Sequence, residues 1–272
     1  MDAIQQGQVQ QSAAEIYEQF FLPALFAQWG GPVLQAAQVG SGQRVLDVAC
    51  GTGILARTAV SHVQPNGRVV GLDINDGMLS VAQKKTSEVE WRHGRAEALP
   101  FDDDSFTAVV SQFGLMFFAD RRQALAEMVR VLKSDGRLAV AVWDSLENTP
   151  GYAVVVALLA RLFGAEVAEG LRSPYVLGDT AELEALFTGL PLADLQIETQ
   201  LGYARFPSIA DWMFTDIRGW TLADVIDDEQ FELLLQEAEV ALRPFCQPDG
   251  TVQFNAPAHI VTAQKSAKSF LE

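Results

Sequence analysis

The chain has 272 residues, of which 49% are hydrophobic and 20% charged, a balance that is typical of folded globular proteins and excludes a disordered or fibrous one. Nineteen lysine and arginine residues against 35 aspartate and glutamate residues give a net charge of −16, which repels the phosphates of nucleic acids. Cys50 and Cys246 show neither zinc-binding spacing nor a disulfide framework. The apolar stretch 152–160 is too short to span a membrane, which takes about 20 residues. We expect a cytoplasmic protein without a metal, a nucleic-acid partner or a transmembrane segment.

The first predicted element is an aromatic-rich helical segment over residues 16–29, which Pro23 kinks and which Gly30, Gly31 and Pro32 interrupt. From residue 44, short apolar runs alternate with stretches of helical spacing. We expect strands at 45–48, 68–72, 89–92, 106–113 and 137–143, and helices at 54–63, 77–85 and 119–132. This alternation predicts right-handed βαβ units and a mostly parallel sheet with helices on both faces.

After residue 143 the alternation loosens. The pattern predicts helices at 149–164 and 180–188, a strand at 193–203, two or three helices within 207–244 and a closing strand at 251–264. We interpret residues 1–272 as one domain with a cofactor-binding core at 40–145 and helical insertions at 146–178 and 207–250. The second insertion carries Trp212, Phe214, Trp220 and Phe231. The two insertions are expected to form a lid with aromatic walls, which would suit a flat or lipophilic acceptor.

A glycine-containing turn between the first predicted strand and helix is the main chemical signal. Gly51 and Gly53 allow a ligand to approach the backbone closely, and with Ala56 they also fit the loose dinucleotide fingerprint. Asp73, at the end of the second strand, would hold a ribose diol in a dinucleotide or in S-adenosylmethionine. The turn therefore does not distinguish between a dinucleotide and S-adenosylmethionine as the cofactor.

Three features favour S-adenosylmethionine over a dinucleotide. Asp47 lies ahead of the glycines, where a carboxylate suits an ammonium group better than a pyrophosphate. The turn at 94–101 can present backbone N–H groups to an adenine edge. The chain ends in a strand after a helical insertion, not in a second βαβαβ half.

Five ordered blocks over about 100 residues resemble the class I S-adenosylmethionine-dependent methyltransferases, in particular the group containing the ubiquinone/menaquinone-biosynthesis C-methyltransferases. The blocks are VLDVACGTG (45–53), GLDINDGML (71–79), GRAEALPF (94–101), SQFGLMFF (111–118) and RVLKSDGRLAV (130–140). The resemblance implies a Rossmann-like fold with a seven-stranded, mostly parallel sheet, helical lid insertions and S-adenosyl-L-methionine as cofactor. The implied activity is methyl transfer to a small-molecule acceptor.

The resemblance also implies a cofactor site, whose parts differ in what they bind. The loop after the first strand would surround the methionine moiety, the next two turns would hold the ribose and adenine, the fourth strand would close the floor, and the N-terminal helix would cap the cofactor. The implied residues are Asp47, Ala49, Gly51, Thr52, Gly53, Asp73, Ile74, Met78, Arg95, Ala96, Glu97, Gln112, Phe113 and Tyr17.

One position departs from the family pattern. Arg95 stands where relatives commonly have Asp or Asn, and arginine has no hydrogen-bond acceptor for an adenine amino group. Either the backbone alone binds the adenine there, or Arg95 points outward or pairs with an acid such as Asp102. If Arg95 pairs with an acid or points outward, only backbone groups of this turn would bind the adenine.

The sequence identifies no catalytic base. Tyr17, Asp144, Tyr175 and His259 are candidates by residue type alone. A non-catalytic S-adenosylmethionine-binding relative and a nicotinamide-dependent oxidoreductase are the alternative functions. The acceptor atom stays open, as does the choice between a monomer and a homodimer.

Overall fold

The computed structural model describes residues 11–219 and 222–267, and its central feature is a seven-stranded sheet with the order β3-β2-β1-β4-β5-β9-β6. Strands β1 to β5 run parallel, whereas β9 is antiparallel to both of its neighbours, β5 and β6. The strands are β1 (Arg44–Val48), β2 (Arg68–Asp73), β3 (Val89–His93), β4 (Phe106–Gln112), β5 (Leu132–Trp143), β6 (Leu192–Gln200) and β9 (Ala258–Lys265). The predicted mostly parallel sheet is confirmed.

Connecting helices pack against this sheet. They are α3 (Gly30–Ala36), α4 (Ile54–Val63), α5 (Asp76–Lys85), α6 (Arg121–Val131) and α9 (Thr180–Ala185). The central strands β1 and β4 are apolar on both faces and buried, because helices cover both sides, whereas the edge strands β3 and β6 carry exposed residues. The core therefore lies in the middle of the sheet, under β1, β4 and β5.

The N-terminal helical segment continues past its predicted end at residue 29. Helix α2 (Gln11–Ile16) continues into the π-helical η1 (Tyr17–Phe26), which contains Pro23, and then into η2 (Ala27–Trp29). Gly30, Gly31 and Pro32 do not interrupt the helical segment, because α3 begins at Gly30. A proline is tolerated in the first turn of a helix, where the backbone N–H has no intrahelical acceptor.

Two predicted strands are each divided in two. The run 193–203 becomes β6 and β7 (Tyr203–Phe206), and the run 251–264 becomes β8 (Val252–Asn255) and β9. Strands β7 and β8 pair as a separate ribbon, and the Ala256 N–H donates to the Gly202 carbonyl at 2.8 Å between the two sheets. Pro257 lacks an N–H and cannot extend the ladder. Any side chain at residue 202 would overlap Trp29, so only glycine fits there.

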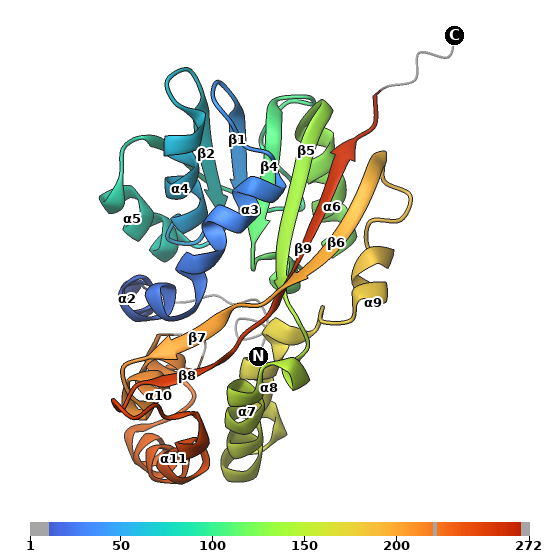
Figure 1. The fold of residues 1–272 in the computed structure, drawn as a ribbon. Coiled ribbons are helices and arrows are strands. Elements are labelled where there is room, and N and C mark those ends of the chain that lie inside the picture. The colour runs from blue at the N-terminus through green and yellow to red at the C-terminus, as the bar shows by residue number, and fades with distance from the viewer. Residues whose placement is uncertain (1–10, 220–221, 268–272) are drawn as a thin grey trace.

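Four helices gather beyond the carboxyl ends of the parallel strands, around the β7–β8 ribbon (Figure 1). They are α7 (Pro150–Phe163), α8 (Ala165–Arg172), α10 (Ile209–Arg218) and α11 (Asp228–Ala241), with the short turns η4 (Leu146–Asn148), η5 (Ser173–Tyr175) and η6 (Arg243–Phe245). Tyr152, Phe206, Trp212 and Phe254 pack together inside this group. Among the described helices, none is long and apolar enough to cross a membrane.

Candidate cofactor and acceptor site

A cavity of about 140 Å³ opens at the carboxyl ends of β1, β2, β3 and β4; we call it the glycine-loop cavity. In parallel α/β sheets this edge is where ligands bind, because the loops there diverge around a crevice. Twelve of the fourteen predicted cofactor residues line the cavity: Tyr17, Asp47, Ala49, Gly51, Asp73, Ile74, Met78, Arg95, Ala96, Glu97, Gln112 and Phe113. Thr52 and Gly53 do not line it.

The loop after β1 has an unusual backbone. Ala49, Gly51 and Gly53 have φ angles of 59°, 56° and 87°, and Phe113, across the cavity, has 57°. The left-handed region is strained for residues with a side chain, and such strain persists only where the surroundings enforce it, often at a ligand site. A Cβ atom on Gly51 would meet only open space, whereas one on Gly53 would overlap the Trp91 indole. Gly53 therefore serves packing, and Gly51 leaves backbone open to the cavity.

Asp73 ties this loop to the end of β2. Its Oδ2 accepts a hydrogen bond from the Gly51 N–H at 2.7 Å, and its Oδ1 accepts one from the Asn75 N–H at 2.8 Å. Burial raises the pKa of Asp73, while these backbone donors and the nearby His93 oppose the rise. The Ile74 N–H is a further backbone donor to this carboxylate. A carboxylate has about four acceptor positions, so Asp73 can still accept a hydrogen bond from a ligand hydroxyl.

Asp47 is almost fully buried at the floor of the cavity. Its Oδ2 accepts from the Ala56 N–H at 3.0 Å, whereas its Oδ1 has no hydrogen-bond partner among the described residues. Burial raises the pKa of Asp47 well above its ordinary value, and the neighbouring Asp73 adds to the rise. The Gln112 Oε1 is also buried without a partner in the described part of the chain, although its Nε2 donates to the Phe26 carbonyl at 3.2 Å. The cavity floor thus offers unused acceptors.

The turn after β3 closes one side of the cavity. Arg95 Nε lies 3.6 Å from Glu97 Oε2, so the acid that pairs with Arg95 is Glu97 and not Asp102. Glu97 Oε1 accepts from the N–H groups of Ala119 and Asp120 at 2.9 and 3.4 Å. Glu97 therefore also anchors the turn to the segment that starts α6.

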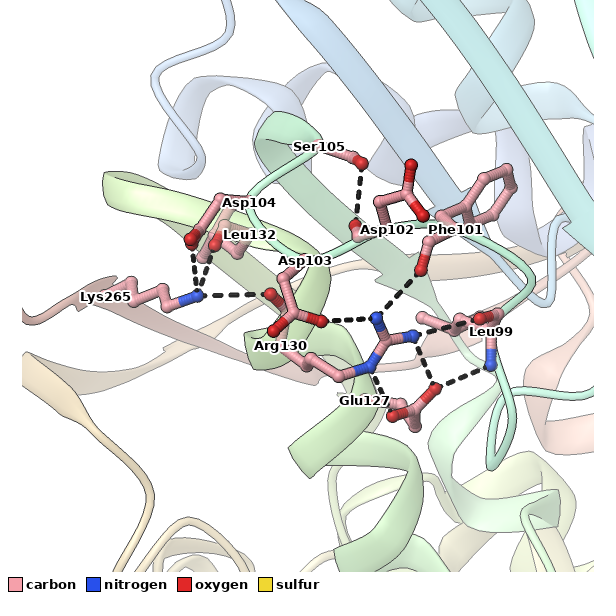
Figure 2. Close-up of polar contacts among 10 residues, drawn as sticks. All are labelled: Leu99, Phe101, Asp102, Asp103, Asp104, Ser105, Glu127, Arg130, Leu132 and Lys265. Atoms are coloured by element: carbon pink, nitrogen blue, oxygen red, sulfur yellow. Dashed lines mark hydrogen bonds and ion pairs between the residues drawn. The ribbon is translucent and has the colours of Figure 1, made fainter.

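Arg130 of α6 fixes the rest of that turn (Figure 2). It donates to the carbonyls of Leu99 and Phe101 at 3.0 and 2.8 Å and to Asp103 Oδ1 at 2.8 Å. Glu127 accepts from Arg130 Nε at 2.6 Å and from the Leu99 N–H at 2.8 Å. These charge-assisted bonds lower the pKa of Glu127. Both ends of the turn are thus attached to the helix.

A second cavity adjoins the first and is walled by aromatic and apolar side chains; we call it the aromatic cavity. Phe113 and Phe117 line both cavities, and Phe113 stacks on Trp143 with ring centroids 3.7 Å apart. The remaining wall residues come from η1, α7, α8 and η5: Phe21, Leu25, Phe26, Tyr152, Leu171, Pro174 and Tyr175.

The structure differs from the sequence predictions at several residues around the two cavities. Trp212 does not line the aromatic cavity but packs inside the group of helices behind it, and Trp220 lies outside the described residues. Asn75 lines the glycine-loop cavity and caps α5 by accepting from the Met78 N–H at 3.0 Å. Its position after Asp73, ahead of a helical run, is an N-cap signal. Cys50 is buried and lines the same cavity.

The four candidate bases separate by position. Tyr17 lines the glycine-loop cavity and Tyr175 the aromatic one. His259 Nε2 lies 3.3 Å from Asp144 Oδ1 and 3.0 Å from the Gly178 carbonyl, and neither His259 nor Asp144 lines either cavity. The His259–Asp144 pair joins β9 to the segment after β5.

Residues 21–163, slightly more than half of the chain, match the sequence profile of the ubiE/COQ5 methyltransferase family. The chain belongs to this family. The methyltransferase is 34% identical over 194 residues to the demethylmenaquinone methyltransferase of Listeria monocytogenes serotype 4a (strain HCC23), covering 68% of this chain and 80% of that protein. It is also 34% identical over 188 residues to the enzyme of that name from Staphylococcus carnosus (strain TM300), covering 64% and 78%.

Solved structures share the fold of the methyltransferase. The YcgJ protein from Bacillus subtilis aligns with a TM-score of 0.61 and 23% identity, covering 88% of this chain and 99% of that one. Haemonchus contortus phosphoethanolamine N-methyltransferase 2, in complex with S-adenosyl-L-methionine, aligns with a TM-score of 0.62 and 18% identity, covering 98% and 60%. The predicted fold class is confirmed, and the protein is an S-adenosylmethionine-dependent methyltransferase.

The donor and acceptor chemistry of the glycine-loop cavity fits this cofactor. S-adenosylmethionine carries an ammonium group, two ribose hydroxyls and an adenine amino group, all of which donate hydrogen bonds. Asp47 Oδ1 and Gln112 Oε1 are acceptors that lack a donor among the described residues. A dinucleotide would instead bring a pyrophosphate toward the Asp47 carboxylate, so the oxidoreductase alternative is not supported.

Proposed function

We propose that this methyltransferase acts on a flat, apolar ring compound that carries an acidic hydroxyl or an equivalent activated position, and that this acceptor occupies the aromatic cavity. The observation that carries the proposal is the shared wall of the two cavities, formed by Phe113 and Phe117. Because both residues line both cavities, the cavities meet there, and an acceptor in one would lie next to a cofactor in the other. The names of the Listeria and Staphylococcus relatives point to a quinone-related ring, which has this shape and polarity.

The aromatic wall selects for such a ring by its chemistry. Phe26 meets Phe113 edge to face at 5.5 Å between centroids, and Trp29 meets both Phe113 and Trp143. Aromatic surfaces of this kind bind flat rings by offset stacking and edge contacts. The wall residues include no lysine or arginine, so the described part of the cavity offers no cationic partner for a phosphate.

We assign the cofactor contacts by the same chemistry. Asp47 would bind the ammonium group and Asp73 the ribose hydroxyls. The loop Ala49–Gly53 would surround the methionine moiety, with Thr52 supporting the loop from behind. Ile74, Met78 and the turn at 95–97 would pack around the adenine. Gln112 and Phe113 would close the floor, and Tyr17 would cover the top.

The bound cofactor supplies a methyl group on a positively charged sulfur, ready for in-line displacement. The chain has to align the acceptor with that methyl group and exclude water. Positioning alone can contribute about 7–11 kcal/mol in the best cases. The Phe113–Trp143 stack provides a rigid floor for this alignment, and the insertions at 146–178 and 207–250 would act as the lid.

An activity assay with matched acceptors tests the proposal. With S-adenosylmethionine as donor, a 1,4-naphthoquinol is expected to be methylated and phosphoethanolamine is not. Methylation of phosphoethanolamine alone would overturn the apolar acceptor. Absence of turnover on every ring acceptor, with intact cofactor binding, would instead support the non-catalytic alternative.

A cavity-filling variant tests the location of the acceptor. Leu171 lines the aromatic cavity and not the glycine-loop cavity. Leu171→Phe is expected to raise KM for the ring acceptor about tenfold, with little change in cofactor affinity. Leu162→Phe, on the neighbouring α7 and outside both cavity walls, is the matched control. Equal effects of the two variants would contradict the location.

We further infer that nucleic acid is not an acceptor, on the support of the net charge of −16. The homodimer and the cytoplasmic location stay predictions. Sedimentation of the purified chain tests the first, and fractionation of cells that express it tests the second.

A further inference from the structure

A buried carboxylate without a cation lies behind the aromatic cavity. Asp216 of α10 is fully buried. Its Oδ1 accepts a hydrogen bond from the Tyr152 hydroxyl at 3.1 Å, and its Oδ2 accepts one from the Trp212 Nε1–H at 2.8 Å. No lysine, arginine or histidine in the described part of the chain forms an ion pair with it.

Packing does not explain this carboxylate. A buried ionised group without a counter-ion is costly, and an apolar or amide side chain would fill the same space at a lower cost. Tyr152 and Trp212 each satisfy one oxygen, but neither neutralises the charge. A group retained in this setting is a candidate for a role in proton transfer.

The Asp216 carboxylate is connected to the cavity by a wall residue. Tyr152, which donates to Asp216, lines the aromatic cavity together with Tyr175, and the two rings have centroids 5.9 Å apart. Tyr152 and Tyr175 bring the only side-chain hydroxyls to the described cavity wall. The Tyr175 hydroxyl forms no hydrogen bond within the described residues and feels the charge of Asp216. Among the described wall residues, these two tyrosines are therefore the hydroxyl partners that a polar atom of a bound ring could find.

We propose that Tyr152 binds the acidic hydroxyl of the acceptor and passes its proton to Asp216, with Tyr175 as the second hydroxyl contact. This inference rests on the proposed function, because it needs the ring acceptor in the aromatic cavity. Tyr152 touches the acceptor and is the catalytic residue. Asp216 acts through Tyr152 and is a positioning residue and proton store.

The transfer balances in protons and electrons. The acceptor O–H bond breaks and its proton forms a new O–H bond on the Tyr152 oxygen, while the former Tyr152 proton moves to Asp216 Oδ1. The electron pair left on the acceptor forms the bond to the methyl carbon. The carbon–sulfur bond breaks with its electron pair on sulfur. No oxidant or metal is required.

The pH dependence has a defined sign. Burial raises the pKa of Asp216 to about 8, against the opposing hydrogen bonds from Tyr152 and Trp212. The titratable groups that face Asp216 are Tyr152 from α7 and Tyr175 from η5. The elements α2, η1, β7 and α11 also pack on α10 and contribute no titratable group to this pKa. A base accepts protons only when ionised, so kcat is expected to rise with pH through about 8.

The decisive experiment uses two probes that differ by one hydroxyl, 2-naphthol and naphthalene, with binding measured by calorimetry above pH 8 in the absence of cofactor. The wild-type protein is expected to bind 2-naphthol about tenfold more tightly than naphthalene. In Tyr152→Phe this preference is expected to fall, because only the Tyr175 hydroxyl remains, and in Asp216→Asn it is expected to fall because Tyr152 no longer donates to a carboxylate; naphthalene binding is expected to be unchanged. Tyr203→Phe, on β7 and outside both cavity walls, is the matched control and is expected to keep the preference.

The outcomes separate the two proposals. Equal weakening of both probes in the variants would mean that the pair only supports the fold, and would overturn the proton transfer. A preference that keeps its wild-type size in both variants would overturn it as well. Failure of either probe to bind the wild-type protein would overturn the acceptor cavity itself. In the activity assay, Asp216→Asn is expected to remove the rise of kcat near pH 8 without changing cofactor affinity, and Asp216→Glu is expected to restore part of it.

Discussion

The Asp73 carboxylate accepts a hydrogen bond from the Gly51 amide at 2.7 Å and so joins the end of β2 to the loop after β1. The same carboxylate, through its other oxygen, holds the Asn75 N–H ahead of α5. One side chain thus shapes two loops of the glycine-loop cavity and also lines that cavity. Asp73 therefore combines a structural and a binding role.

Replacement of Asp73 tests this double role. Asp73→Ala is expected to lower the affinity for S-adenosylhomocysteine at least about tenfold, because hydrogen bonds to a charged group contribute about 1.5–3 kcal/mol each. Calorimetric titration measures the change. Asp76→Ala is the control, because that carboxylate is close in sequence but 89% exposed. A folded Asp73→Ala protein with wild-type affinity would show that the cofactor binds elsewhere.

We expect the Asp47 carboxylate to destabilise the folded protein while it contributes to cofactor binding. Burial raises the pKa of Asp47, so the folded protein holds the carboxyl proton more tightly than the unfolded chain does. Asp47 therefore destabilises the fold increasingly as the pH rises above 3.8, the ordinary pKa of the carboxyl. Asp47→Asn removes that cost. We expect the variant without ligand to melt higher at neutral pH, by about 2–4 °C for each kcal/mol gained.

The same variant is expected to bind S-adenosylhomocysteine about tenfold more weakly, since an amide cannot pair with an ammonium group. Thermal unfolding across the pH range and calorimetric titration check the two effects. The gain in melting temperature should shrink as the pH falls and vanish below pH 3.8, where the carboxyl becomes protonated in the unfolded chain as well as in the folded protein. A destabilised Asp47→Asn at neutral pH would contradict the account.

Two glycines of one loop are expected to respond differently to the same change. Gly51→Ala and Gly53→Ala both place a side chain in the left-handed region, which costs on the order of 1–3 kcal/mol. Gly53→Ala also drives its methyl group into the Trp91 ring, whereas Gly51→Ala faces open space. Denaturant unfolding should show the larger loss for Gly53→Ala.

Cofactor affinity should also differ between the Gly51→Ala and Gly53→Ala variants. Gly51 lines the glycine-loop cavity, so Gly51→Ala is expected to weaken cofactor binding beyond its effect on stability. In a Trp91→Ala background the overlap is absent, so Gly53→Ala is expected to cost less stability there than in the wild-type protein, which a double-mutant cycle measures. Equal stability losses in the two single variants would contradict the assigned contact with Trp91.

The clamp formed by Glu127 and Arg130 predicts a pH-dependent loss of stability. Hydrogen bonding to Arg130 lowers the pKa of Glu127, so its contribution is present above the ordinary value of 4.5 and is lost as the pH falls through the lowered pKa. Glu127→Gln is expected to cost about 1–3 kcal/mol at neutral pH, because a hydrogen-bonded ion pair is broken. Urea unfolding at several pH values measures the cost.

The Glu127→Gln deficit should shrink below pH 4.5, whereas the control Glu166→Gln, which alters an exposed residue of α8, should show little effect. The variant is also expected to expose the turn at 94–101 to proteolysis, because Glu127 accepts from the Leu99 N–H. A deficit that stays constant with pH would mean that the charge of Glu127 is not what stabilises the turn.

Local patterns were sufficient for the parallel part of the fold. Each strand from β1 to β5 is an apolar run followed by a turn, and these runs recur with the spacing of βαβ units, so their pairing follows from general rules of handedness. The segment around Gly30 was misjudged because a proline and two glycines read as a break, whereas they occupy a first helical turn. The split of β8 from β9 was also missed, because the bend at Ala256 and Pro257 depends on the sheet that each half joins.

The sequence by itself determined the chemistry of the glycine-loop cavity, because its residues follow successive strands and the ends of parallel strands meet at one edge. Asp47, Gly51 and Asp73 were identifiable for that reason. The tertiary structure alone decided the aromatic cavity and the Tyr152–Asp216 pair. Their residues come from η1, α7, η5 and α10, which no local periodicity relates. Side chains 64 positions apart meet only because α7 and α10 gather beyond the carboxyl ends of the parallel strands, around the β7–β8 ribbon (Figure 1), and such long-range packing leaves no mark in local sequence.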